Sequence, residues 1–261
     1  MTAYPEAAWR QKEPYGAEDK VRRLNHMYGH YGYYFDPTYI LVLIGAALCM
    51  AASSSLNSTY SKYAKVRCMS GMTGAEAAAR ILNYSGIHDV RIEHINGRLT
   101  DHYDPGNKVL RLSDSVYQSN SVAAIGVAAH ECGHAVQHQK GYAPLKIRSA
   151  LVPAANIGSK LGIPMILLGV LLGLSSTLVQ IGIWVFSLSV LFQVVTLPVE
   201  FNASSRALTM LQDCGITGGQ ETGYCQKVLR AAALTYVAAA ASSILQLLRL
   251  ALLFGNRRQD D

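Results

Sequence analysis

Three apolar stretches that are almost free of charge constrain the fold of this chain more than any other feature of its sequence. No Asp, Glu, Lys or Arg occurs between Asp36 and Lys62 or between Lys160 and Glu200, and only Arg249 interrupts the stretch from Ala231 to Asn256. A helix that crosses a bilayer needs about 20 such residues. Only 15% of the chain is charged, against about 25% in soluble domains. The sequence therefore predicts a mainly α, multi-pass membrane protein.

The lengths of these stretches predict four transmembrane helices. The first is retained, because no convincing cleavage site marks it as a signal peptide. The 39 residues between Lys160 and Glu200 are too many for one span and suit two, with a turn in Leu174–Val179. The Ala-rich last stretch fits a fourth span, or a helix on the surface of the protein or bilayer. The predicted spans are residues 37–54, 161–176, 179–198 and 231–254.

The region between the first two predicted spans, residues 55–160, has the pattern of a water-facing α+β unit. Thr73 and Glu76 have the T-x-x-E spacing of a capping box, which predicts a helix after Thr73. Val90–His94 and Val109–Ser113 are short apolar runs separated by turn sequences, so we expect a small sheet built from hairpins. The remaining segments are a polar tail at 1–36 and a helix with a loop at 199–230.

Charge and cysteine content argue against three other classes of protein. The net charge is +6, but the 23 Lys and Arg residues form no dense basic run, so we predict no nucleic-acid binding. The five cysteines are odd in number and contain no C-x-x-C pattern, which indicates neither a disulfide framework nor a zinc finger. A reducing compartment fits this cysteine usage best.

One motif in the α+β region indicates chemistry. His130, Glu131 and His134 form H-E-x-x-H, of which chance predicts only about 0.007 copies in a chain of this composition. Residues four apart on a helix lie one turn above each other, so both imidazoles can bind one Zn²⁺ with the Glu131 carboxylate beside the zinc-bound water. We therefore expect zinc to activate this water and Glu131 to act as the general base in amide hydrolysis.

A catalytic zinc ion usually has a third protein ligand. Glu200 is the first acid after the motif, and no histidine follows His138. If residues 161–198 cross the bilayer twice, Glu200 returns to the side of the motif, so we predict it as the third ligand. The alternative is a juxtamembrane acid that pairs with Arg206. His138 lies about 12 Å along the helix from His130, too far to share one zinc ion, and we expect it beside the cleft.

Basic residues near the ends of the predicted spans indicate the orientation in a cell membrane. Nine lie on the catalytic side and five on the other side, which places the catalytic side in the cytoplasm. The nine are Lys62, Lys65, Arg67, Lys146, Arg148, Lys160, Arg206, Lys227 and Arg230, and the five are Lys20, Arg22, Arg23, Arg257 and Arg258.

Three segments carry a resemblance to a known family: TGAEAAARIL, DHYDPGNKVLRLSDSVYQSNSVAAIGVAAHECGHAVQHQKGYAPLKIRSALVP and PVEFNASSRA. They resemble the YugP-like neutral zinc metallopeptidases of bacterial membranes, over about residues 33–250, and more distantly the HtpX-like gluzincin membrane proteases. The resemblance implies a zincin-like catalytic domain at the membrane surface, with His130, His134 and Glu200 as zinc ligands and Glu131 as general base. HtpX-like enzymes have Asp where this chain has Ser204, which leaves the residue that orients a ligand imidazole unassigned.

The expected partners are peptide or protein substrates, above all membrane proteins, and the lipid bilayer. A non-catalytic zinc-binding membrane scaffold is the main alternative, although such a site does not require Glu131. A metal transporter would place its ligands inside the spans. An intramembrane protease would carry the motif inside an apolar span, whereas polar residues at 117–121 precede it here.

Overall fold

The computed structural model describes residues 36–172 and 176–254. The chain divides into two units after Tyr39, and the description below concerns the unit from Ile40 onward. Apart from Asp36, the predicted tail 1–36 lies outside the described residues. The elements are α2 (Tyr39–Tyr63), α3 (Gly74–Tyr84), β1 (Arg91–Ile95), β2 (His102–Asp104), β3 (Val109–Ser113), α4 (Val122–Gln139), α5 (Ala143–Leu171), α6 (Ser176–Asp213) and α7 (Gly219–Phe254).

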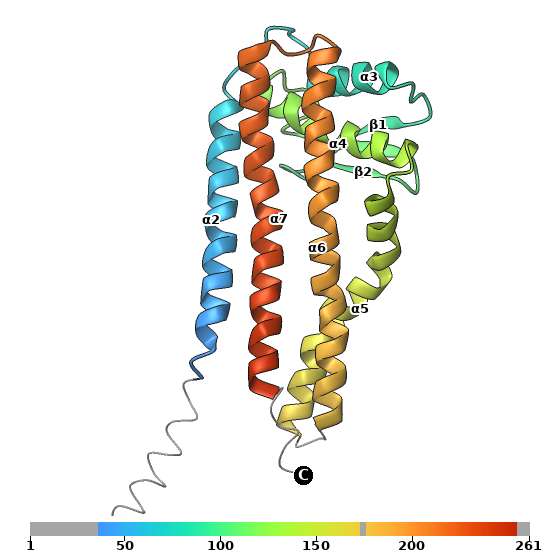
Figure 1. Ribbon diagram of the computed structural model, residues 1–261. Helices are drawn as coiled ribbons and strands as arrows, with labels where there is room; N and C mark the ends of the chain where they lie inside the picture. The colour runs from blue at the N-terminus through green and yellow to red at the C-terminus, as the bar shows by residue number, and fades with distance from the viewer. Residues whose placement is uncertain (1–35, 173–175, 255–261) are drawn as a thin grey trace, which may run out of the picture. The chain divides into compact units, whose positions relative to one another are not determined.

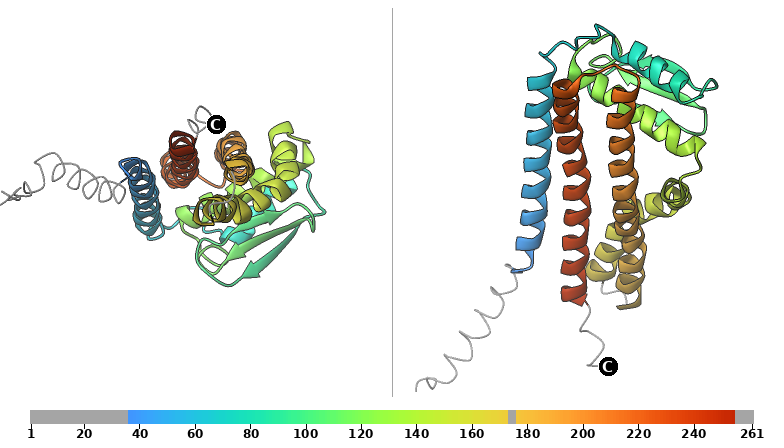
Figure 2. Two further views of the ribbon diagram at one scale, coloured as in Figure 1. Left: turned by 90° about the horizontal axis from the view of Figure 1, so that it is seen from below. Right: turned by 45° about the horizontal axis from the view of Figure 1, so that its top comes forward.

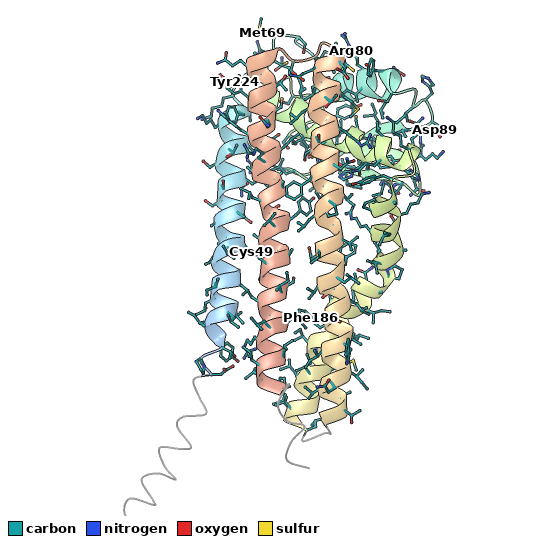
Figure 3. The ribbon with its side chains drawn as sticks, viewed as in Figure 1. Cys49, Met69, Arg80, Asp89, Phe186 and Tyr224 are labelled. Carbon is teal, nitrogen blue, oxygen red and sulfur yellow. The ribbon has the colours of Figure 1, made fainter. Side chains whose placement is uncertain are left out.

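Long helices dominate the fold, and a small sheet lies at one end of them (Figure 1). Among the described residues, four helices, α2, α5, α6 and α7, are long and apolar enough to cross a membrane. The sheet, α3 and α4 gather beside one end of α6 and α7 (Figure 1 and the right view of Figure 2). Arg80 and Asp89 lie at this end, whereas Cys49 and Phe186 lie along the helices away from it (Figure 3). The prediction of a mainly α chain with four membrane-spanning candidates is confirmed.

The helices extend beyond the predicted spans. α6 runs without a break through Glu200 to Asp213, and α7 begins at Gly219, so the stretch predicted as a helix with a loop is mostly helical. α5 contains Pro153 and Pro164, each of which removes a backbone N–H and bends a helix, and Figure 1 shows α5 changing direction. Part of the predicted turn, residues 173–175, lies outside the described residues.

The sheet corrects the expectation of a sheet built from hairpins. Its strand order is β1-β3-β2, with β1 parallel to β3 and β2 antiparallel to β3. Only β2 and β3 form a hairpin. β3 takes the central position because it is the apolar strand, with four of its five residues buried, whereas no residue of β1 or β2 is fully buried. Short apolar runs alone do not show which strand becomes central.

α4 is the buried centre of the unit. It begins at the N-cap residue Ser121, whose hydroxyl accepts a hydrogen bond from the N–H of Ala124 at 3.2 Å. It packs against α3, α6 and α7, and small residues allow the close approach: Gly126 lies against Cys225 of α7. The capping box predicted at Thr73 and Glu76 is confirmed at the start of α3.

Candidate metal centre

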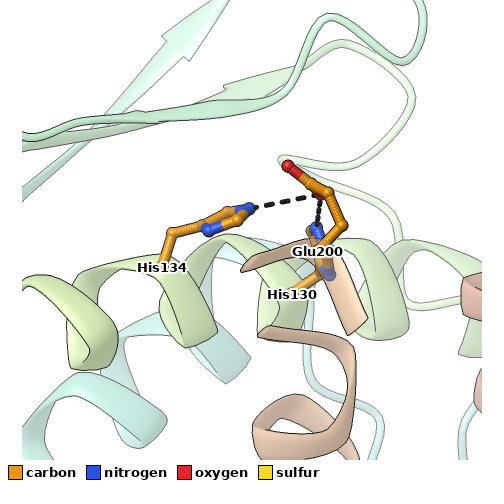
Figure 4. Close-up of side chains that lie close together, drawn as sticks. All are labelled: His130, His134 and Glu200. Atoms are coloured by element: carbon orange, nitrogen blue, oxygen red, sulfur yellow. Dashed lines mark hydrogen bonds and ion pairs between the residues drawn. The ribbon is translucent and has the colours of Figure 1, made fainter. Parts of the chain in front are cut away.

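Three predicted zinc ligands lie together although they come from two helices. His130 and His134 lie on α4 and Glu200 on α6, and one ligand atom of each lies within 4.8 Å of the others (Figure 4). Glu200 Oε2 is 3.2 Å from His130 Nε2 and 3.6 Å from His134 Nε2. Glu200 is only 2% exposed. The fold thus brings a buried carboxylate onto the two imidazoles from 70 residues away.

The donor set suits zinc in both type and spacing. Two imidazole nitrogens and one carboxylate oxygen are ligands that zinc commonly takes. Tetrahedral ligands about 2.1 Å from a zinc ion lie about 3.4 Å from one another, and Glu200 Oε2 lies 3.2 and 3.6 Å from the two nitrogens. Three protein ligands leave the fourth tetrahedral position for water, which is the pattern of a catalytic site.

Gly133 permits α6 to approach α4 at this point. A Cβ atom on Gly133 would lie 2.5 Å from the backbone oxygen of Ala203 and 3.2 Å from its Cα. Ala203 follows Glu200 by one helical turn, so this contact sets the distance between the Glu200 carboxylate and α4. The glycine inside H-E-x-x-H is therefore a spacing residue.

His130 is oriented by Ser204, one turn beyond Glu200 on α6. The hydroxyl oxygen of Ser204 lies 3.1 Å from His130 Nδ1. A hydrogen bond donated by Nδ1 leaves Nε2 with the lone pair that a metal needs, and it fixes the plane of the ring. Ser204 thus fills the position that the sequence left unassigned. Its spacing of four residues from Glu200 is the sequence signal that identifies it.

His134 is oriented by Gln137, a residue that the sequence analysis missed. Gln137 Oε1 lies 3.0 Å from His134 Nδ1. Gln137 Nε2 donates in turn to the carbonyl of Val199 at 2.8 Å and to Asn202 Oδ1 at 3.0 Å. Gln137 is fully buried. The imidazole of His134 is therefore held by a chain of hydrogen bonds that ends on α6.

Charged neighbours surround His134 and Glu200. Burial lowers the pKa of His134, but the hydrogen bond to Glu200 and the negative charge of Glu131 outweigh it, so the pKa is raised above its ordinary value. Glu200 Oε1 points to Arg148 of α5, whose guanidinium nitrogen lies 3.9 Å away. Arg206, the alternative partner of Glu200, instead donates to Asn202 Oδ1 at 2.7 Å.

Glu131 lies outside this ligand group and faces the sheet. It is 8% exposed, and its Oε2 accepts a hydrogen bond from the backbone N–H of Tyr103 in β2 at 3.0 Å. Glu131 and His130 line a pocket, and a second acid, Asp101, lines it with them. Burial raises the pKa of Asp101, although its carboxylate accepts hydrogen bonds from the N–H and hydroxyl of Ser113.

His138 lies at the far end of α4. Its Nδ1 is 2.9 Å from the hydroxyl of Tyr103, and burial, with the charges of Asp89 and Asp104, raises the pKa of Tyr103 to about 12. His138 is not in the ligand group around His130. It lines a pocket at the end of β2 together with Pro105 and Gly106.

Comparison with known proteins shows which family the chain resembles. The family described as "Putative neutral zinc metallopeptidase" matches residues 38–255. "Putative membrane protease YugP" of Bacillus subtilis (strain 168) is 47% identical over 221 residues, which cover 85% of this chain and 98% of that protein. No solved structure matches.

Proposed function

This chain belongs to the family of neutral zinc metallopeptidases, and we propose that it is a gluzincin-like membrane endopeptidase that hydrolyses peptide bonds at the membrane surface. Its cofactor is zinc, and the proposed ligands are His130, His134 and Glu200. The observation that carries the proposal is the convergence of these ligand atoms, together with the pocket that His130 and Glu131 line in common. A bound zinc ion would polarise the substrate carbonyl and lower the pKa of water.

Glu131 is the proposed general base. Its Oε2 is engaged by the N–H of Tyr103, which leaves Oε1 to accept the proton of the attacking water. The same carboxyl then donates that proton to the amine that leaves when the C–N bond breaks. Because Glu131 is buried and held by the backbone, its carboxylate stays in one orientation for both transfers.

The substrate is proposed to bind along β2. This strand is an edge strand of the sheet, and the N–H of Tyr103 points to Glu131, away from β3. The outer edge of β2 therefore faces α4, the helix that carries His130 and His134. An extended peptide that pairs with this edge would hold its scissile bond beside Glu131.

The membrane is the proposed site of action. The curated relative is named a membrane protease, and four helices have the length and composition of spans. We propose that the predicted spans in α2, α5, α6 and α7 all cross the bilayer, with the catalytic side in the cytoplasm, as the excess of Lys and Arg on that side predicts. Membrane proteins and their juxtamembrane segments are then the expected substrates.

The test compares bound zinc and peptide hydrolysis in the wild type and in Glu131→Gln. The substitution keeps the shape and removes the base, so zinc content should be unchanged while hydrolysis of a casein-type substrate falls at least about 100-fold. Undiminished hydrolysis in Glu131→Gln would refute the role of Glu131. A wild type that holds zinc but cleaves no substrate would favour the zinc-binding scaffold instead.

A further inference from the structure

A pocket of about 150 Å³ borders His130 and Glu131 on the side of the long helices. Its other walls come from four parts of the chain: α2, the segment before β2, α4 and α7. Most of the side chains that form these walls are apolar: Leu56, Leu99, Val127, Val228, Leu229 and Ala232. Three other polar residues border it, Asp101, Thr235 and Tyr236, and each already has a partner. Asp101 accepts two hydrogen bonds from Ser113, the Thr235 hydroxyl donates to the carbonyl of Ala232 at 2.7 Å, and Tyr236 is hydrogen-bonded to Glu200. The pocket is therefore suited to an apolar group.

This pocket lies at the start of β2, close to the place where the scissile bond of a peptide bound along β2 would lie. Leu99 and Asp101 border it at the start of the strand, and the N–H of Tyr103 contacts Glu131 in the middle of the strand. A second cavity, of about 420 Å³, lies beside Pro105 and Gly106 after the strand. Asp101 and Pro105 are about 13 Å apart along an extended strand. A peptide lying along β2 with its scissile bond at Glu131 would place side chains toward both cavities.

We propose that the pocket beside His130 and Glu131 is a specificity pocket, which takes a large aliphatic side chain from a substrate residue next to the scissile bond. This inference rests on the proposed peptidase function and names its substrate class: proteins cleaved at Leu-like residues. Two of the walls, Leu56 and Ala232, come from helices that are apolar enough to cross a membrane. A substrate residue at the end of an apolar, membrane-spanning segment would therefore suit this pocket.

Ala232 offers the sharpest test, because its small side chain leaves the pocket open. In Ala232→Phe the ring would fill the space that the substrate side chain needs. The assay measures kcat/KM for two peptides that differ only in Leu or Ala next to the scissile bond, with cleavage sites mapped by mass spectrometry. The wild type should prefer the Leu peptide at least about 10-fold, and Ala232→Phe should abolish this preference while still cleaving the Ala peptide.

Leu234→Phe is the matched control. Leu234 lies on the same helix, is 52% exposed and does not line the pocket, so this variant should keep the wild-type preference. Leu56→Ala works in the opposite direction. It enlarges the pocket and should raise kcat/KM for a Trp peptide relative to the Leu peptide, without loss of bound zinc.

The outcomes separate this inference from the proposed function. A zinc-loaded wild type that cleaves neither peptide would refute the peptidase function. Cleavage without a preference for Leu, or an unchanged preference in Ala232→Phe, would overturn the specificity pocket and leave the peptidase function standing. If Ala232→Phe fails to fold, as judged by lost helical content, Leu56→Ala decides: an unchanged ratio of Trp to Leu cleavage overturns the inference.

Discussion

Gly133→Ala should weaken zinc binding without touching a ligand. The new Cβ would lie 2.5 Å from the backbone oxygen of Ala203, whereas ordinary contact begins at 3.4 Å. Relief of this overlap needs a displacement of about 0.9 Å between α4 and α6. Zinc ligation tolerates deviations of about 0.2 Å, so Glu200 would no longer reach a zinc ion held by the two histidines. We expect zinc affinity to fall at least about 10-fold.

The assay is a zinc titration against a chelator of known affinity, with thermal unfolding measured on the same samples. Gly126→Ala is the matched control, because it adds the same methyl group to the same helix but meets Cys225 Cβ at 3.3 Å. Both variants gain helix propensity of about 1 kcal/mol, while overpacking costs Gly133→Ala about 1–3 kcal/mol. Wild-type zinc affinity in Gly133→Ala would refute the argument that this glycine sets the ligand spacing.

Three further predictions concern the ligands and the membrane. Glu200→Ala should lose most bound zinc with helical content intact, whereas Asp213→Ala should keep its zinc; stoichiometric zinc in Glu200→Ala would eliminate this ligand. Protons compete with zinc for His134, whose pKa in the metal-free protein is raised above 6.5. The plot of log zinc affinity against pH should therefore break at a pH above 6.5, with affinity lost as the pH falls through this break; a break at or below pH 6.5 would contradict this. In intact cells a membrane-impermeant thiol reagent should not label Lys140→Cys, an exposed position after α4, until the cells are permeabilised; ready labelling from outside would reverse the proposed orientation.

Features that depend on neighbours along the chain could be predicted from the sequence alone. The H-E-x-x-H spacing places two imidazoles on one helical face whatever surrounds the helix, and α4 contains the whole motif. The lengths of the uncharged stretches indicated four apolar helices, and the structure contains them. The capping box at Thr73 and Glu76 is equally local. Each of these features depends only on residues that are close to one another along the chain, within a few helical turns or within the length of one membrane span.

Contacts between distant segments were decided only by the tertiary structure. The sequence offered Glu200 by elimination, but the return of α6 beside α4 placed its carboxylate 3.2 Å from His130. The orienting contacts of Ser204 and Gln137, the approach of Arg148 and the central position of β3 belong to the same class. Side-chain periodicity shows which face of an element is apolar, but the partner of that face depends on how all elements pack together. The helix that carries two of the proposed metal ligands could therefore be predicted from the sequence, whereas the position of the third depends on the packing of α6 onto α4.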